Sequence, residues 1–232
     1  MRFFPAGLLL AALGGLAFAA LAEPPHRVTL HYDVSRNGTL MVEATETLEH
    51  DSRSYSIRSE WKGKGLLALV RTGSAKRSSE GTLGAAGLRP LEFRDQRGDA
   101  APGVVRFDWT QHLLVREYEG RVETQSLPEG AQDRLSFAWG FAFAPPARKE
   151  IEAAIADARG LSRQRYSVAG TEMLSTAAGN FEALRLVKRR ESGDRRAAEI
   201  WLATKANYVP LRILVIEKDG TRIDQVVTRI GG

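Results

Sequence analysis

Most of the chain alternates between apolar and polar positions with a period of two, the pattern of a half-buried β-strand. Between residues 27 and 35, apolar side chains from Val28 to Val34 alternate with polar neighbours. A second alternating run covers residues 39–48, and Asn37-Gly38 stands between the two runs. Because both residues of an Asn-Gly pair tolerate positive φ angles, the pattern predicts an N-terminal β-hairpin.

Turn residues separate further segments of this kind. In the first half of the chain, we predict strands over 55–61, 91–97, 104–109 and 112–118. In the last third, we predict strands over 163–168, 172–176, 181–190, 196–203, 210–217 and 221–230. The polar segment 74–81 is predicted to be an exposed strand, and the apolar run 66–70 a buried strand or one helical turn. Asp219-Gly220 predicts a tight hairpin turn between the last two strands.

One segment departs from the strand pattern. Residues 133–143 place apolar side chains at helical spacing after Asp133, whose carboxylate suits a helix N-cap, and Pro145-Pro146 ends the segment. We predict a short helix there. Residues 147–158 favour a helix by their Ala and Glu content, yet Ile151, Ala153 and Ile155 alternate as in a strand. Both alternatives stay open, and we favour a hairpin with 163–168.

These elements predict a mainly β protein. We expect a single curved antiparallel sheet, a half-barrel or open barrel, with one or two short helices covering its apolar face. The sequence has no long linker or fixed-period repeat, so we expect one domain over residues 23–232.

The first 22 residues differ from the rest of the chain. Met1-Arg2 is followed by an apolar run that ends in Ala20-Leu21-Ala22, a small-x-small pattern. This is typical of a signal peptide that is cleaved on export, and we expect a periplasmic protein. No later apolar run approaches the roughly 20 residues that a membrane helix needs, so we expect no membrane span after cleavage.

Composition narrows the classes of partner and chemistry. The chain has no cysteine, which excludes disulfides, thiolate metal sites, cysteine nucleophiles and a lipid-modified cysteine. The net charge of +5 is spread over a surface on which acids and bases interleave, so we expect no nucleic-acid partner.

The sequence shows no constellation of catalytic residues. No Gly-x-Ser-x-Gly motif is present, and the four histidines lack metal-ligand spacing. Asp108, beside Trp109, fits a turn-capping role, and Asp133 is the other acid of interest should the protein be a hydrolase. We therefore predict no catalytic residue, no metal, no cofactor and no enzymatic activity.

Aromatic side chains give a different signal. They fit an ordinary core, or they line an apolar cavity between a curved sheet and a helix. For the cavity we name six residues: Trp61, Trp109, Phe137, Trp139, Phe141 and Trp201.

Three blocks of sequence resemble a known family. They are residues 55–70, residues 87–93 with 107–109 and 133–136, and residues 199–203 with 209–213 and 219–220. In order and spacing they resemble the exported bacterial proteins grouped as domain of unknown function 3108. The third block is also similar to the end of the periplasmic lipoprotein-carrier fold, which implies a half-barrel around an apolar hollow with helices as a lid. The first family brings no reaction and no site residues with it.

Two functions remain open from the sequence. The first is a periplasmic, non-enzymatic protein that binds a hydrophobic ligand, such as a lipid or acyl chain, within the curved sheet. The alternative is a structural or regulatory module of the cell envelope that binds another protein through an exposed strand edge and takes no small ligand.

Overall fold

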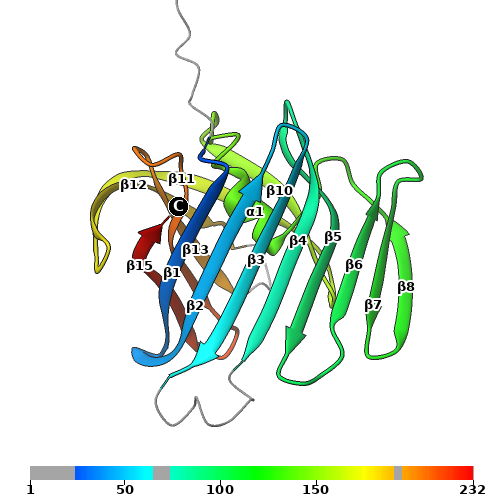
Figure 1. Ribbon diagram of the computed structural model, residues 1–232, viewed down its shortest axis with the longest axis horizontal. Coiled ribbons are helices and arrows are strands. Elements are labelled where there is room, and N and C mark those ends of the chain that lie inside the picture. The colour runs from blue at the N-terminus through cyan, green and yellow to red at the C-terminus, as the bar shows by residue number, and fades with distance from the viewer. Residues whose placement is uncertain (1–23, 65–73, 191–194, 232) are drawn as a thin grey trace, which may run out of the picture.

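About two thirds of the described residues lie in β-strands. The computed structural model describes residues 24–64, 74–190 and 195–231 (Figure 1). The first eight strands are β1 (Arg27–Arg36), β2 (Thr39–His50), β3 (Ser54–Gly63), β4 (Ala75–Gly84), β5 (Gly87–Arg97), β6 (Gly103–Asp108), β7 (Leu113–Tyr118) and β8 (Arg121–Ser126). The remainder are β9 (Gln132–Asp133), β10 (Glu150–Asp157), β11 (Gly160–Thr176), β12 (Gly179–Lys188), β13 (Ala197–Ala203), β14 (Pro210–Ile216) and β15 (Arg222–Gly231).

All these strands join one open, curved sheet in the order β8-β7-β6-β5-β4-β3-β2-β1-β15-β14-β13-β12-β11-β10-β9. Neighbours pair antiparallel, as hairpins do, except that β9 runs parallel to β10. The two terminal strands meet in the middle, where Tyr32 of β1 pairs with Val227 of β15. The sheet thus has two arms, β2–β8 and β9–β14, on either side of the β1–β15 pair.

The two arms overlap where they meet. Gly103 of β6 lies so close to the β10–β11 turn that a Cβ on it would come 2.4 Å from the Cβ of Ala158. Ala156 of β10 is buried in the same cluster as Val105 and Phe107 of β6. The sheet therefore curls like a spiral, with β6 lying against the outside of β10.

One helix occupies the hollow of the curl. Helix α1 (Arg134–Gly140) contacts β4 and β5 of one arm and β10 of the other (Figure 1). Leu135 and Trp139 pack into the larger apolar cluster, which includes the inner faces of β1–β3. Phe137 and Phe141 pack into a second cluster against β10–β13. A single short helix thus fills part of the space between the arms.

The predicted fold class and most predicted elements are confirmed. The N-terminal hairpin, the helix capped by Asp133 and the final hairpin are present, and residues 150–157 form a strand of the β10–β11 hairpin. The predictions for residues 1–22 and 66–70 lie outside the described residues.

Three expectations differ from the structure. Segment 74–81 is a strand, but its inner face is buried, since Ser79 lies under the helix. The strands predicted over 163–168 and 172–176 are one strand, β11, because a bulge at Gly170 (φ +114°) lets the strand continue. Strand β8 was not predicted, because its side chains are nearly all polar and exposed.

Candidate functional site

Helix α1 is fixed to the sheet by a buried carboxyl group. The Trp139 side chain is fully buried, and its Nε1–H donates to Oε2 of Glu46 at 2.9 Å. The other oxygen of Glu46 accepts hydrogen bonds from Ser59 (3.1 Å) and Gln225 (3.3 Å). Burial raises the pKa of Tyr32, and the charge of Glu46 adds to that effect. These contacts connect the helix to strands β2, β3 and β15.

A second carboxyl group holds the start of the helix. Asp133 is fully buried and accepts hydrogen bonds from the backbone amides of Leu135 (2.8 Å) and Ser136 (3.0 Å). Ser79 of β4 donates to its Oδ2 at 2.6 Å, and Tyr55 of β3 bonds to Ser79. Burial raises the pKa of Asp133 in spite of these donors. Asp133 therefore acts as a helix cap that is also tied to the sheet.

The six aromatic residues predicted for a pocket do not gather at one place. Trp139 lies in the larger cluster with Glu46, while Phe137 and Phe141 contact each other in the second cluster, with ring centroids 5.3 Å apart. Each of these three side chains is buried by the protein's own atoms.

The remaining three tryptophans each lie beneath an arginine. Arg77 covers Trp61 and Arg89 covers Trp109, both with the guanidinium carbon 4.6 Å from the ring centroid. Trp201 is covered by Arg212 at 4.6 Å and by Arg185 at 5.4 Å. Such cation–π contacts stabilise the pairs by about 0.5–2 kcal/mol each. Of the six, Trp61 alone lies beside the charged group described next.

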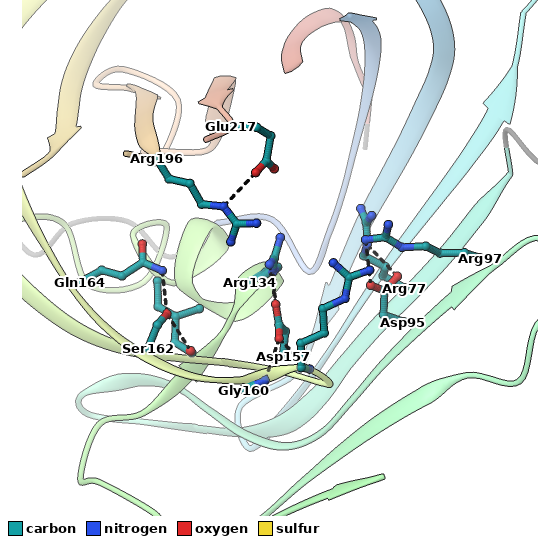
Figure 2. A network of polar contacts seen from close by, with 12 residues as sticks. Arg77, Asp95, Arg97, Arg134, Asp157, Gly160, Ser162, Gln164, Arg196 and Glu217 are labelled. Atoms are coloured by element: carbon teal, nitrogen blue, oxygen red, sulfur yellow. Dashed lines mark hydrogen bonds and ion pairs between the residues drawn. The ribbon is translucent and has the colours of Figure 1, made fainter. Parts of the chain in front are cut away.

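Charged side chains gather at one end of the hollow between the arms (Figure 2). Those on β4 and β5 lie one or two inward-facing positions beyond the buried core: Arg77 is two residues before Ser79 on β4, and Asp95 is two residues after Phe93 on β5. We call this group, together with the neutral Gln164 beside it, the charged rim: Arg77, Asp95, Arg97, Arg134, Asp157, Gln164, Arg196 and Glu217.

On one side of the charged rim, two arginines share a carboxylate. Arg77 Nε lies 3.0 Å from Asp95 Oδ1, and Arg97 reaches Oδ2 of the same residue at 3.7 Å. Only 16% of the Arg77 side chain is exposed. Burial lowers the pKa of Arg77; Asp95 opposes this, whereas the charges of Arg97 and Arg134 lower the pKa further.

The other side of the charged rim holds two more ion pairs. Arg134, at the start of α1, pairs with Asp157 at the end of β10, with Nε 3.0 Å from Oδ2. Burial acts to raise the pKa of Asp157, but Arg134 and two backbone amides outweigh it and lower that pKa. Arg196 pairs with Glu217 at 2.8 Å. Figure 2 shows Arg134 between the Arg77 group and the Arg196 pair, all facing the same space.

Beneath the charged rim, the inner wall formed by β13, β14 and the adjoining β15 is only partly covered. Ile213 faces inward, because it pairs with Gln225, which bonds to Glu46. The next inward row towards the charged rim is formed by Ala198, Val215 and Ile223, which pair across β13, β14 and β15. These four apolar side chains keep part of their surface exposed, whereas Ile200 and Leu202 nearer the helix are buried. An amphipathic surface results, apolar inside and charged at its edge.

Two hollows are defined by their lining residues, and no residue of the charged rim lines either of them. One of about 620 Å³ is lined by residues of β2–β5, among them the acidic Glu49, Glu80 and Glu92. The other, of about 290 Å³, lies at the end of β4 and β5 beside Lys76 and Gln96. None of the six predicted aromatic residues lines either hollow.

The residues weighed for catalysis have structural partners. Asp108 accepts from the backbone amides of Thr110 and Gln111, which confirms its turn-capping role. His50 is buried against Phe143 and bonds to the Pro24 carbonyl oxygen, and His31 bonds to Thr45. Across the described ranges, no three His, Asp or Glu side chains are grouped as metal ligands would be.

The charged rim was not found in the sequence. Its four arginines come from four separate segments, and each stands among other charged residues, so none is distinctive by itself. A signal that could have been used is strand alternation, since residues an even number of positions apart face the same side of a sheet. By this rule Arg77 shares the inward face with Ser79, and Arg196 with Ile200. An inward-facing arginine at a strand end is the feature that could have been marked.

Comparisons with known proteins agree on the family and the fold. The model of DUF3108, described as a protein of unknown function, matches residues 29–227. No curated protein matches the chain. A solved beta-barrel-like protein of domain of unknown function DUF1849 from Brucella abortus has 9% identity and a TM-score of 0.55, covering 89% of this chain and 98% of its own. At that identity the likeness shows a shared fold and nothing about activity.

A second solved structure gives a weaker likeness. It is a protein described as exported, with a YmcC-like fold, from Bacteroides fragilis, at 11% identity and a TM-score of 0.40 over 90% of this chain and 98% of that one. That score is too low to establish a shared fold. In the described part of the chain, no helix has the length and apolar character needed to cross a membrane.

Proposed function

The chain belongs to the DUF3108 family of proteins of unknown function, and from its geometry we propose that it is a non-enzymatic carrier of an amphiphilic ligand. The ligand's apolar part, such as an acyl chain, lies against the inner wall of the second arm beneath the charged rim. The observation that supports this most directly is the partly exposed row of Ala198, Val215 and Ile223. Apolar side chains left half-covered at the mouth of a curved sheet suit a hydrophobic ligand.

The six aromatic residues take a smaller part in this proposal than the sequence suggested. Trp61 borders the proposed site from beneath Arg77, while Trp139, Phe137 and Phe141 hold the helix that forms its floor. Trp109 and Trp201 lie under arginines away from the charged rim.

We also propose that residues 1–22 direct export to the periplasm and are removed, leaving one domain of residues 23–232. The apolar run before Ala20-Leu21-Ala22 supports this. Cell fractionation and the intact mass of the purified protein test it. A cytoplasmic protein that retains Met1 would contradict the proposal.

The carrier proposal is tested with a neutral fluorescent probe, N-phenyl-1-naphthylamine, and purified residues 23–232. The probe is expected to bind and to be displaced by a lysophospholipid. Ala198→Phe fills the inner wall and is expected to weaken probe binding by about tenfold. The matched control is Ala197→Phe, since Ala197 is the adjacent alanine on the opposite face of β13. Equal effects of the two substitutions, or no binding by the unchanged protein, would refute the carrier function.

A specific feature also supports the alternative of protein binding. Strand β8 pairs with β7 alone among the described strands, and Val122 on it is 66% exposed. An unpaired strand edge can accept a strand from another protein.

The lack of cysteine makes this alternative testable. A Val122→Cys variant carries a single thiol for crosslinking in intact envelopes, and Met173→Cys, equally exposed on β11, is the control. A crosslinked species specific to position 122 is expected if β8 docks a partner. The same pattern from both positions would remove the support for β8.

A further inference from the structure

Charge at the charged rim is unevenly balanced. Among the described residues that define it, four arginines pair with three carboxylates, and Asp95 serves both Arg77 and Arg97. Arg77 is the most confined of the four, held between the ring of Trp61 and Asp95. A guanidinium that has lost much of its hydration, next to others of the same sign, attracts an anion more strongly than a surface arginine does.

Three of these arginines come from elements that lie against one another. Arg77 and Arg97 come from neighbouring strands of one arm, and Arg134 comes from α1, which lies against that arm. Burial is the main cause of the lowered pKa of Arg77, and the charge of Arg134 makes a small contribution to it. In Figure 2, the Arg134 side chain pairs with Asp157, and the group of Arg77, Asp95 and Arg97 lies to one side of this pair. More than half of the side-chain surface of Arg97 and Arg134 is exposed, so both can turn towards a ligand.

The apolar row of the second arm begins beside this space. Arg196 is two residues from Ala198, and Glu217 is two residues from Val215, so the ion pair continues the inward-facing row. A molecule lying along Val215 and Ala198 would therefore present its end to the arginines. We propose that the charged rim binds the anionic head group of an amphiphile, a carboxylate or a phosphate, through Arg77, Arg97 and Arg134.

This inference rests on the proposed carrier function and adds the charge of the ligand to it. Guanidinium groups form bidentate, charge-assisted hydrogen bonds with carboxylates and phosphates. The arginines would exchange part of their pairing with Asp95 and Asp157 for contact with the head group. Since the charged rim is open to solvent, salt is expected to weaken the interaction.

The test compares two probes with the same acyl chain, cis-parinaric acid, which is anionic at neutral pH, and its uncharged methyl ester. The protein is residues 23–232 at low salt. We expect the acid to bind about tenfold more tightly than the ester, the effect of one charge-assisted contact. Combined Arg97→Gln and Arg134→Gln substitutions are expected to remove this preference and leave binding of the ester unchanged. Both side chains are largely exposed, so the fold should tolerate the changes.

Arg94→Gln is the matched control, since Arg94 lies on the outer face of β5 and pairs with Glu92. It should keep the preference for the acid. Equal binding of acid and ester by the unchanged protein would overturn the inference and leave the carrier function standing. So would a preference that persists in the double variant. If neither probe binds, the carrier function itself fails.

Inorganic phosphate identifies the source of the anion. If millimolar phosphate leaves the bound acid in place, the anion belongs to the amphiphile, as proposed. Displacement of the acid by micromolar phosphate, with the ester unaffected, would overturn the head-group assignment in favour of a free phosphate ion.

Discussion

At the scale of single residues, the bond between Trp139 and Glu46 decides where the helix lies. A seven-residue helix is too short to be stable alone, so its position must come from tertiary contacts. The indole ring contributes buried apolar area, and its N–H orients the side chain by donating a hydrogen bond to one carboxyl oxygen of Glu46. Glu46 in turn is held by Ser59 and Gln225, so the orientation of the helix is fixed from three strands.

Replacing this tryptophan should be costly in two separable ways. Trp139→Ala is expected to lower the free energy of unfolding by about 3–5 kcal/mol, because a fully buried ring leaves a cavity. Trp139→Phe keeps most of the volume but leaves Glu46 Oε2 without its donor, and we expect a loss of about 1–3 kcal/mol. Urea unfolding followed by circular dichroism measures both. Val122→Ala, at an exposed site, should change stability by less than about 0.5 kcal/mol. A value near zero for Trp139→Ala would show that the helix does not depend on this contact.

At the scale of elements, helix α1 begins with a carboxyl group, Asp133, whose pKa is higher in the folded protein than in a free chain. Burial raises the pKa of Asp133 above its ordinary value of 3.8. The folded protein therefore binds more protons than the unfolded chain between 3.8 and the raised value, and this group loses stabilising effect as the pH rises through that window. Asp157, whose pKa is lowered, acts in the opposite direction.

An asparagine at position 133 should reveal this dependence. Asn is also a good N-cap, but it carries no charge at any pH. The stability of the natural protein relative to Asp133→Asn is expected to fall as the pH is raised from below 3.8 towards neutrality. Urea midpoints at a series of pH values measure the difference. If the natural protein instead gains on the variant with rising pH, its hydrogen-bond donors outweigh burial.

Period-two alternation predicted most elements correctly, because a strand of an antiparallel sheet with one apolar face needs an apolar side chain at every second position. The prediction from alternation failed where a strand has no buried apolar face. Strand β8 has no buried face and so no alternation, while the inner face of β4 carries Ser79 and Arg77 in place of apolar residues. The charged rim was not predicted either, because its members come together only through the strand register of both arms, which the sequence pattern does not give.

At the scale of the whole molecule, the curl depends on how closely its arms approach. The sequence predicted a curved sheet, but not that β6 would lie against β10, since this contact joins residues far apart in the chain. Gly103 permits it, because any side chain there would meet Ala158 and the ring of Tyr118.

Gly103→Ala should therefore separate the arms. An added Cβ would lie 2.4 Å from that of Ala158, and relieving the overlap is expected to cost about 1–3 kcal/mol of stability. Gly84→Ala is the matched control, since a Cβ at Gly84 meets nothing within 4 Å. Thermal unfolding of both variants makes the comparison. Equal melting temperatures would mean that the overlap is loose enough to absorb a methyl group.

The pairing of β1 with β15 has a consequence for biogenesis. Strand β1 can pair with β15 only after all of β15 has been synthesised and has reached the same compartment. A chain exported from its N-terminus would thus emerge with its central seam open, and long-range pairing of this kind forms slowly. A product truncated before β15 would expose two unpaired strand edges, one on β1 and one on β14, because β15 lies between these strands in the sheet. Such a fragment would be prone to proteolysis and to aggregation through these unpaired edges, so a stable fold requires β15.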